Sequence, residues 1–203
     1  LYVRPQTGLG RQRQQAADHR LDLYRAGRDE LLSQGYRQSS MRCFRRASAV
    51  FSERTVYSCQ SDGMVGLGCG ARSYTRQLHY ATRFAVTQAG VRAILKDWVR
   101  QTDDELALAT HGIWLSADER RRRFVILSLL QAEGIDGDRY RQQFGGDPRE
   151  DLPVVSQLFE RGWIEQRAAV ITLTAEGMEC SDIIGPMLYS ADVRAQLEAF
   201  VQL

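Results

Sequence analysis

The stretch YSCQSDGMVGLGCGARSYT, residues 57–75, constrains the fold of this chain more than any other part of the sequence. Its glycines Gly66, Gly68 and Gly70 alternate with other residues. Because glycine lacks a Cβ atom, these positions can adopt positive φ and let the backbone pass close to another group. We therefore expect a loop that approaches either a ligand or a neighbouring strand, and the spacing alone favours neither.

The same glycines formally match the dinucleotide-binding pattern G-x-G-x-x-A, which ends here at Ala71. In that pattern a helix begins within the glycines, and an acidic residue follows about 20 positions later. Residues 72–75 are predicted to be extended or looped, and the first acidic residue after the glycines is Asp97. This context disfavours a dinucleotide-binding fold.

Composition is typical of a folded protein. The chain has 203 residues, of which 43% are hydrophobic, enough for the core of one or two domains. It contains no run of about 18 apolar residues and no apolar leader, so we expect a cytoplasmic protein without a membrane partner. The chain starts with LYVRP, without methionine and in what reads as the middle of a strand. We therefore expect it to be a fragment.

Metal and hydrolase signatures do not appear in the sequence. The cysteines lack both paired CxxC spacing and the close clustering of an iron–sulfur site; they are Cys43, Cys59, Cys69 and Cys180. The three histidines are scattered and form no HExxH pair. We expect no metal site and no catalytic residue in this chain.

Charge is distributed unevenly along the chain. Residues 1–100 carry 17 basic and 7 acidic side chains, whereas residues 101–203 carry 10 and 18. A basic first half can attract an anionic ligand, although the two halves could equally attract each other. One basic cluster could clamp carboxylates bidentately or could simply be exposed charge; it comprises Arg37, Arg42, Arg45 and Arg46.

The first half of the sequence predicts an α/β arrangement. Hydrophobic spacing predicts a helix over residues 14–32, which Gly35 ends, and a later helix over residues 84–99. Predicted strands cover residues 1–4, 36–44, 54–59 and 64–67.

The second half predicts helices around one hairpin. Ser116 and Glu119 fit a capping box that opens a helix over residues 117–132, and a short helix follows at 139–144. A helix over residues 152–161 should end at Gly162, before a hairpin of residues 163–166 and 170–174. Thr174 and Ser190 should cap further helices, with a break at Gly185-Pro186. This order is winged-helix-like.

Nucleic-acid binding is not expected despite that order. The segment that would enter a groove, residues 147–165, carries five acidic and two basic side chains. Phosphate neutralisation supplies most nonspecific affinity for nucleic acid, so this surface would repel a duplex. The run Arg120 to Arg123 spreads around a helix and is expected to be a solvated face.

Several stretches in order resemble the oxygen-independent coproporphyrinogen III oxidase family of radical S-adenosylmethionine enzymes. They are LYVRPQT, LLSQGY, YSCQSDGMVGLGCGARS, LSADERRRRFVILSLL, FERGWIEQ and ITLTAEG. They span nearly the whole chain and are similar to the C-terminal portion of such a protein. The resemblance implies that residues 1–99 are the closing part of a partial TIM-like barrel with a linking helix. Residues 100–203 would be the family's winged-helix-like C-terminal domain.

The resemblance also implies a function. In that family a [4Fe-4S] cluster on a CxxxCxxC loop cleaves S-adenosylmethionine, and porphyrinogen propionates are oxidatively decarboxylated in heme biosynthesis. This chain has no CxxxCxxC, so neither cofactor is expected to bind it tightly and the chain alone should be inactive. The implied contacts to S-adenosylmethionine in the longer protein are Val3, Gly66, Gly68, Gly70, Ala71 and Arg72. The implied partner is a small, anionic, porphyrinogen-like molecule.

Two alternatives stay open. Heme chaperones are similar but carry an HNxxYW motif, and residues 54–58 contain neither its histidine nor its tryptophan. The second alternative is a non-catalytic winged-helix domain for regulation or interaction.

Overall fold

A computed structural model describes residues 19–46, 48, 63–83, 85 and 87–201. The chain divides into two compact units, one formed by Leu1–Val50 with Arg121–Leu203 and the other by Phe51–Arg120. Each unit is described by itself below. The strands predicted at residues 1–4 and 54–59 lie outside the described residues, and the predicted domain boundary near residue 99 stays a prediction.

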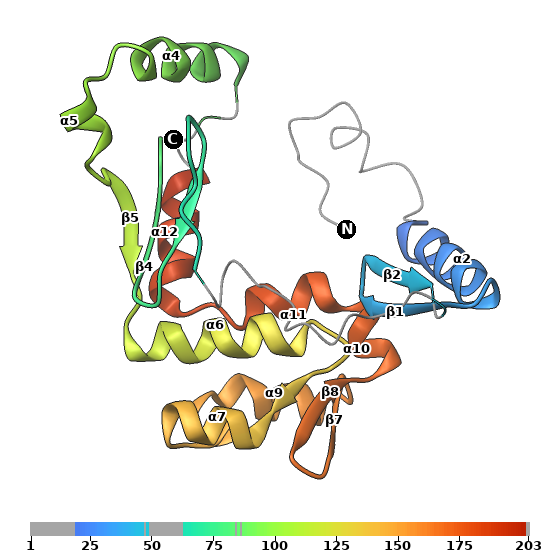
Figure 1. The fold of residues 1–203 in the computed structure, drawn as a ribbon. Coiled ribbons are helices and arrows are strands. Elements are labelled where there is room, and N and C mark those ends of the chain that lie inside the picture. Colours follow the sequence, from blue (N-terminus) through green and yellow to red (C-terminus); the bar gives the residue numbers. More distant parts are fainter. Residues whose placement is uncertain (1–18, 47, 49–62, 84, 86, 202–203) are drawn as a thin grey trace. The chain divides into compact units, whose positions relative to one another are not determined.

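The first unit begins with a helix and a hairpin (Figure 1). Helix α2 spans Arg20–Ser33 and ends before Gly35, whose φ is +79°, as the sequence predicts. Strands β1 (Tyr36–Ser40) and β2 (Cys43–Arg46) then pair antiparallel. The single strand predicted over residues 36–44 is therefore wrong. The chain reverses around Met41, which is 7% exposed and turns into the protein at that point.

The second unit is a small antiparallel sheet with two helices. Its strands are β3 (Arg72–Tyr74), β4 (Leu78–Ala81) and β5 (His111–Trp114), in the order β3-β4-β5. Helix α4 (Gln88–Trp98) starts later than predicted because Thr87 caps it, accepting a hydrogen bond from the Gly90 amide at 3.1 Å. Neither α5 (Asp103–Leu106) nor β5 was predicted, and the predicted strand 64–67 is reduced to a bridge at Met64.

Helices and a three-stranded sheet complete the first unit (Figure 1). The sheet has the order β6-β8-β7, with all pairings antiparallel. The elements in chain order are α6 (Ala117–Leu129), β6 (Ile135–Asp136), α7 (Gly137–Phe144), α8 (Pro148–Asp151), α9 (Pro153–Glu160), β7 (Ile164–Arg167), β8 (Val170–Leu173), α10 (Ala175–Glu179), α11 (Ser181–Met187) and α12 (Ala191–Val201).

Most local signals in this part are confirmed. Ser116 and Thr174 accept capping hydrogen bonds from the amides of Glu119 and Gly177, both at 3.1 Å. Gly162 has φ +69° and donates to Phe159, while Trp163 donates to Leu158. These two bonds form a Schellman motif, so α9 ends where the sequence predicts.

Two predicted boundaries are wrong for tertiary or steric reasons. Helix α6 stops at Leu129 rather than 132 because Ala132 donates to Ser39 of β1 at 2.8 Å. The helix predicted over residues 152–161 is present as α9, and Pro153 keeps Leu152 extended between α8 and α9. The helix break predicted at Gly185-Pro186 is also wrong, because Pro186 does not interrupt the helix. It lies inside the last turn of α11, which therefore lacks the one intrahelical hydrogen bond that the Pro186 nitrogen cannot donate.

The hydrophobic core lies between residues 125 and 188. Val125 and Leu129 of α6, Tyr140 of α7, Leu158 of α9 and Ile184 of α11 are all fully buried. Helix α2 contributes no buried residue. The part of unit one that follows residue 120 therefore holds its own core, and α2 is attached to it by other means.

The arginine run of α6 is not the solvated face that the sequence predicts. Only Arg120 is exposed. Arg121 pairs with Asp151, with Nε 3.3 Å from Oδ2, and Arg122 donates to the Leu188 carbonyl at 3.0 Å. Because the run begins one turn into a packed helix, successive guanidinium groups reach neighbouring elements on different sides.

Among the described residues, no helix has the length and apolar character needed to cross a bilayer.

Candidate functional site

The predicted glycine loop is closed at its base by backbone pairing in unit two. Met64 and Tyr74 exchange two hydrogen bonds of 2.9 and 2.8 Å. Gly66 packs against the strand that follows, because a Cβ atom there would overlap the Arg72 carbonyl oxygen. The Gly66 amide also donates to the hydroxyl of buried Ser73 at 3.0 Å. Gly66 is therefore needed for close packing.

Gly68 and Gly70 serve a different purpose. Their φ angles are +93° and +78°, and a Cβ on either would meet no atom within 4 Å. The Gly70 amide donates to the Thr82 hydroxyl at 2.6 Å, which fixes the turn against the start of the next connection. These two glycines are needed for backbone conformation, and the space beside them is open to a ligand.

The structure brings five of the six predicted cofactor contacts together. Gly66, Gly68, Gly70 and Ala71 lie in the loop, and exposed Arg72 begins β3. The side chains of Val65 and Leu67 at the loop are 71% and 90% exposed. Val3 lies outside the described residues. That these groups contact a cofactor stays a prediction.

The structure also bears out the rejection of a dinucleotide fold. No helix begins within the described glycine loop, and strand β3 follows it directly. The backbone amides there do not converge at a helix N-terminus, which is the feature that holds a pyrophosphate.

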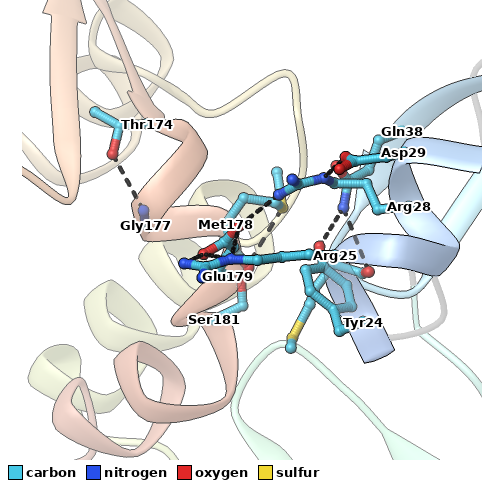
Figure 2. Close-up of polar contacts among 11 residues, drawn as sticks. Tyr24, Arg25, Arg28, Asp29, Gln38, Thr174, Gly177, Met178, Glu179 and Ser181 are labelled. Atoms are coloured by element: carbon cyan, nitrogen blue, oxygen red, sulfur yellow. Dashed lines mark hydrogen bonds and ion pairs between the residues drawn. The ribbon is translucent and has the colours of Figure 1, made fainter. Parts of the chain in front are cut away.

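A second concave site lies in unit one, between α2, β1 and α10. Its volume is about 530 Å³. Its lining comprises Arg25, Arg28, Asp29, Leu32, Gln38, Ala175, Glu176, Met178 and Glu179. Glu179 is 9% exposed and lies between two guanidinium groups (Figure 2). No local sequence pattern indicates this site, because the residues of α2 and of α10 that line it lie about 150 positions apart in the chain.

Ion pairs dominate this second site. Arg25 binds both carboxylate oxygens of Glu179, with Nε–Oε1 at 3.0 Å and Nη2–Oε2 at 2.7 Å. Arg28 donates from Nη1 to Oε1 of the same carboxylate at 2.5 Å and from Nε to Asp29 at 2.8 Å. Hydrogen bonding from Arg25, and then from Arg28, holds the pKa of Glu179 below its usual value, against the opposing effect of burial.

The predicted basic cluster is partly occupied by the chain's own groups. Arg42 donates from Nη2 to both carboxylate oxygens of Asp182, at 2.5 and 2.6 Å. Arg46 donates to the Tyr36 hydroxyl at 3.3 Å. Arg37 and Arg45 lie directly opposite each other in the β1–β2 register. The clamped carboxylate predicted for Arg42 is therefore an internal one.

The described residues do not offer a ligand set for a metal cluster. Among them, no group of three or more His, Cys, Asp or Glu side chains could hold a metal ion. The described cysteines, Cys43, Cys69 and Cys180, are free thiols. Cys59 lies outside the described residues.

Comparison with known proteins identifies the class of the C-terminal region. Residues 115–179 match the family described as the HemN C-terminal domain. No curated protein matches the chain.

A solved structure extends the likeness beyond that domain. The chain is similar to coproporphyrinogen III oxidase (HemN) from Escherichia coli, whose structure is described as that of a radical SAM enzyme. The identity is 22%, the TM-score is 0.64, and the match covers 85% of this chain but 41% of that one. The chain thus spans less than half the length of the protein it matches. The resemblance to the C-terminal portion of this family is confirmed, and the chain shares the α/β fold of the matched part.

Proposed function

We propose that this chain is the C-terminal portion of a radical S-adenosylmethionine enzyme related to oxygen-independent coproporphyrinogen III oxidase. The parent would be a cytoplasmic oxidoreductase that decarboxylates propionate groups of a porphyrinogen-like substrate. The observation that carries the proposal is the HemN C-terminal domain at residues 115–179, set within a fold similar to HemN over 85% of the chain.

The finer architecture is part of the proposal. Residues 1–99 would close a partial barrel, and residues 100–203 would form a winged-helix-like domain. The element order α6, β6, α7, α9, β7 and β8 supports the second part, as does the position of β8 between β6 and β7. In a winged helix a short strand after the first helix joins the hairpin strands in the same way.

The cofactors differ in how well the described residues fit them. A [4Fe-4S] cluster does not fit, because the described thiols form no ligand group. Its loop would lie in the missing part of the longer protein. S-adenosylmethionine fits better, since Gly68 and Gly70 leave open space beside a fixed turn. When bound and cleaved, it supplies the group that abstracts hydrogen from the substrate.

The chain's own residues would then act by position and charge. Gly66 holds the loop against β3, and Gly68 with Gly70 lets a ligand approach the backbone. Exposed Arg72 offers a planar set of N–H donors that matches a carboxylate. The basic first half favours an anionic small molecule, and the acidic α9 region disfavours nucleic acid.

The test begins with the encoded sequence upstream of Leu1. A CxxxCxxC motif within a barrel-sized segment is expected there, and an open reading frame that begins near Leu1 would sink the proposal. The full-length protein, purified without oxygen, should show [4Fe-4S] absorbance and release 5′-deoxyadenosine from S-adenosylmethionine. Absence of that product with an intact cluster would also contradict it.

Two glycine substitutions test whether the glycine loop forms part of the S-adenosylmethionine site. Gly68→Val in the full-length protein should weaken S-adenosylmethionine binding while leaving cluster absorbance unchanged. Gly145→Val is the matched control, because Gly145 also has positive φ (+78°) and open space around its missing Cβ. Equal binding losses in both variants would mean that backbone strain, and not the loop, explains the effect.

A further inference from the structure

Helix α2 is attached to the rest of unit one mainly through charged groups. None of its residues is buried, and Leu21, Leu23 and Leu32 are 42%, 71% and 43% exposed. A helix normally docks by burying an apolar stripe. Among the large apolar side chains of α2 only Tyr24 and Leu31 are half-buried, so apolar packing contributes less to holding it in place than in an ordinary docked helix.

The described ion pairs between α2 and α10 converge on one carboxylate. Arg25 and Arg28, one helical turn apart, both bind Glu179 at the end of α10 (Figure 2). Such charge-assisted, partly bidentate pairs are stronger than neutral hydrogen bonds. Glu179 is nearly enclosed, at 9% exposure, whereas Arg25 is 47% exposed. Salt can therefore reach one side of the contact.

The neighbouring hairpin is attached in a different way. Ser39 accepts a backbone hydrogen bond from Ala132, and Ser40 pairs with Gln131 in a β-bridge. Met41 is buried, and Arg42 pairs with Asp182. Backbone bonds and a buried side chain thus fix the hairpin, whereas the described ion pairs between α2 and α10 all go to Glu179.

A single glycine with open space beside it connects the two. Gly35 lies between α2 and β1 with φ +79°, and no atom lies within 4 Å of the Cβ position it lacks. Tyr24 of α2 receives a hydrogen bond from Gln38 of β1 at 2.7 Å, close to this joint. A change of φ and ψ at Gly35 could swing α2 without disturbing β1.

We propose that α2 is a hinged lid over the cavity between α2, β1 and α10, and that the Glu179 carboxylate holds it closed. Four of the cavity's lining residues, Arg25, Arg28, Asp29 and Leu32, belong to α2. Releasing Glu179 therefore removes one wall of this partly open cavity of about 530 Å³ and widens its access to solvent. This inference does not depend on the proposed enzymatic function.

The charges around Glu179 set the conditions for release. The groups that face it or influence it are Arg25, Arg28, Asp29, Asp22, Glu176 and Cys180. The two arginines are the groups nearest to Glu179, and the acidic groups weaken the attraction between these arginines and the Glu179 carboxylate. Salt near 1 M, at which the Debye length is about 3 Å, should screen the exposed side of the contact and open the lid.

Hydrogen exchange of the whole chain tests the lid. Glu179→Gln should raise amide exchange rates in α2 by about ten-fold or more, because each arginine loses a charged partner. Exchange in α6 and α9 should not change. Glu176→Gln is the matched control on the same helix, since its amide oxygen can still accept from Trp163 Nε1, and α2 exchange should not rise above that of the wild type.

High salt provides a second measurement that needs no substitution. The wild-type chain at about 1 M salt should show the same selective increase in α2, while Glu179→Gln should respond little to salt. The proposal is overturned if neither the substitution nor salt changes α2 exchange. It is also overturned if α2, α6 and α9 exchange together, because the helix would then open only with the core.

Discussion

Replacing Gly177 with alanine tests the packing of α10 on the hairpin. Gly177 is buried, and a Cβ atom there would overlap the carbonyl oxygen of Trp163 and lie 2.8 Å from its carbonyl carbon. That carbonyl accepts the Thr174 amide at 3.0 Å, and the Gly177 amide donates to the Thr174 hydroxyl at 3.1 Å. The methyl group can be accommodated only if the backbone of Trp163 or of α10 moves.

The magnitude follows from three contributions. Forcing a methyl group into a filled backbone contact costs about 1–3 kcal/mol. Displacing the Trp163 carbonyl weakens one backbone hydrogen bond, for about 1 kcal/mol more. Alanine's better helix propensity offsets up to about 1 kcal/mol. We therefore expect Gly177→Ala to lower the free energy of unfolding by about 2 kcal/mol.

The control is the same substitution in another helix interior. A Cβ on Gly27 of α2 would meet no atom within 4 Å, so Gly27→Ala should keep or raise stability, by up to about 1 kcal/mol. Guanidinium unfolding followed by tryptophan fluorescence and circular dichroism measures both variants. If Gly177→Ala unfolds at the same midpoint as the wild type, α10 does not pack on the Trp163 carbonyl and the reasoning is refuted.

Three further predictions concern pH, a buried hydroxyl and iron. The pKa of Glu179 is lowered in the folded protein, so its contribution to stability is present above the ordinary value of 4.5 and is lost as pH falls through the folded pKa. Urea unfolding across this range should show the free energy of unfolding of the wild type converging on that of Glu179→Gln. Tyr140→Phe should cost about 1 kcal/mol at neutral pH, since the Tyr140 hydroxyl donates to Asp151 at 2.9 Å. Burial is the largest cause of the raised pKa of Tyr140, and the hydrogen bond to Asp151 adds to it. The stability that Tyr140 contributes is therefore present below pH 10 and lost at higher pH. A stability difference between the wild type and Tyr140→Phe that stays constant up to strongly alkaline pH would contradict this. Reconstitution of the chain with iron and sulfide should give no stoichiometric [4Fe-4S] absorbance. Finding that absorbance would show that the cysteines of this chain can ligate a cluster.

The glycine pattern predicted the loop at the candidate site but not the role of each glycine. Alternating glycines predicted a loop with close approach, and the loop is present, followed by strand β3 where the sequence predicted an extended or looped segment. The pattern could not divide the glycines by role, because positive φ and steric closeness favour the same residue type. The fold separates them: Gly66 meets the Arg72 backbone, whereas Gly68 and Gly70 have positive φ and free space.

The sequence by itself determined the features that depend on neighbours a few positions away. The caps at Ser116 and Thr174 and the Gly162 helix end rest on contacts within about one helical turn, and the β7–β8 hairpin pairs residues from Ile164↔Leu173 to Arg167↔Val170. Tertiary structure decided what distant groups do to one another. It ends α6 early through β1 and gives the predicted arginine clusters their internal carboxylates. It also joins α2 to Glu179 across about 150 residues. Local hydrogen bonding follows from sequence order, but the partner of a charge depends on which surfaces the core brings together.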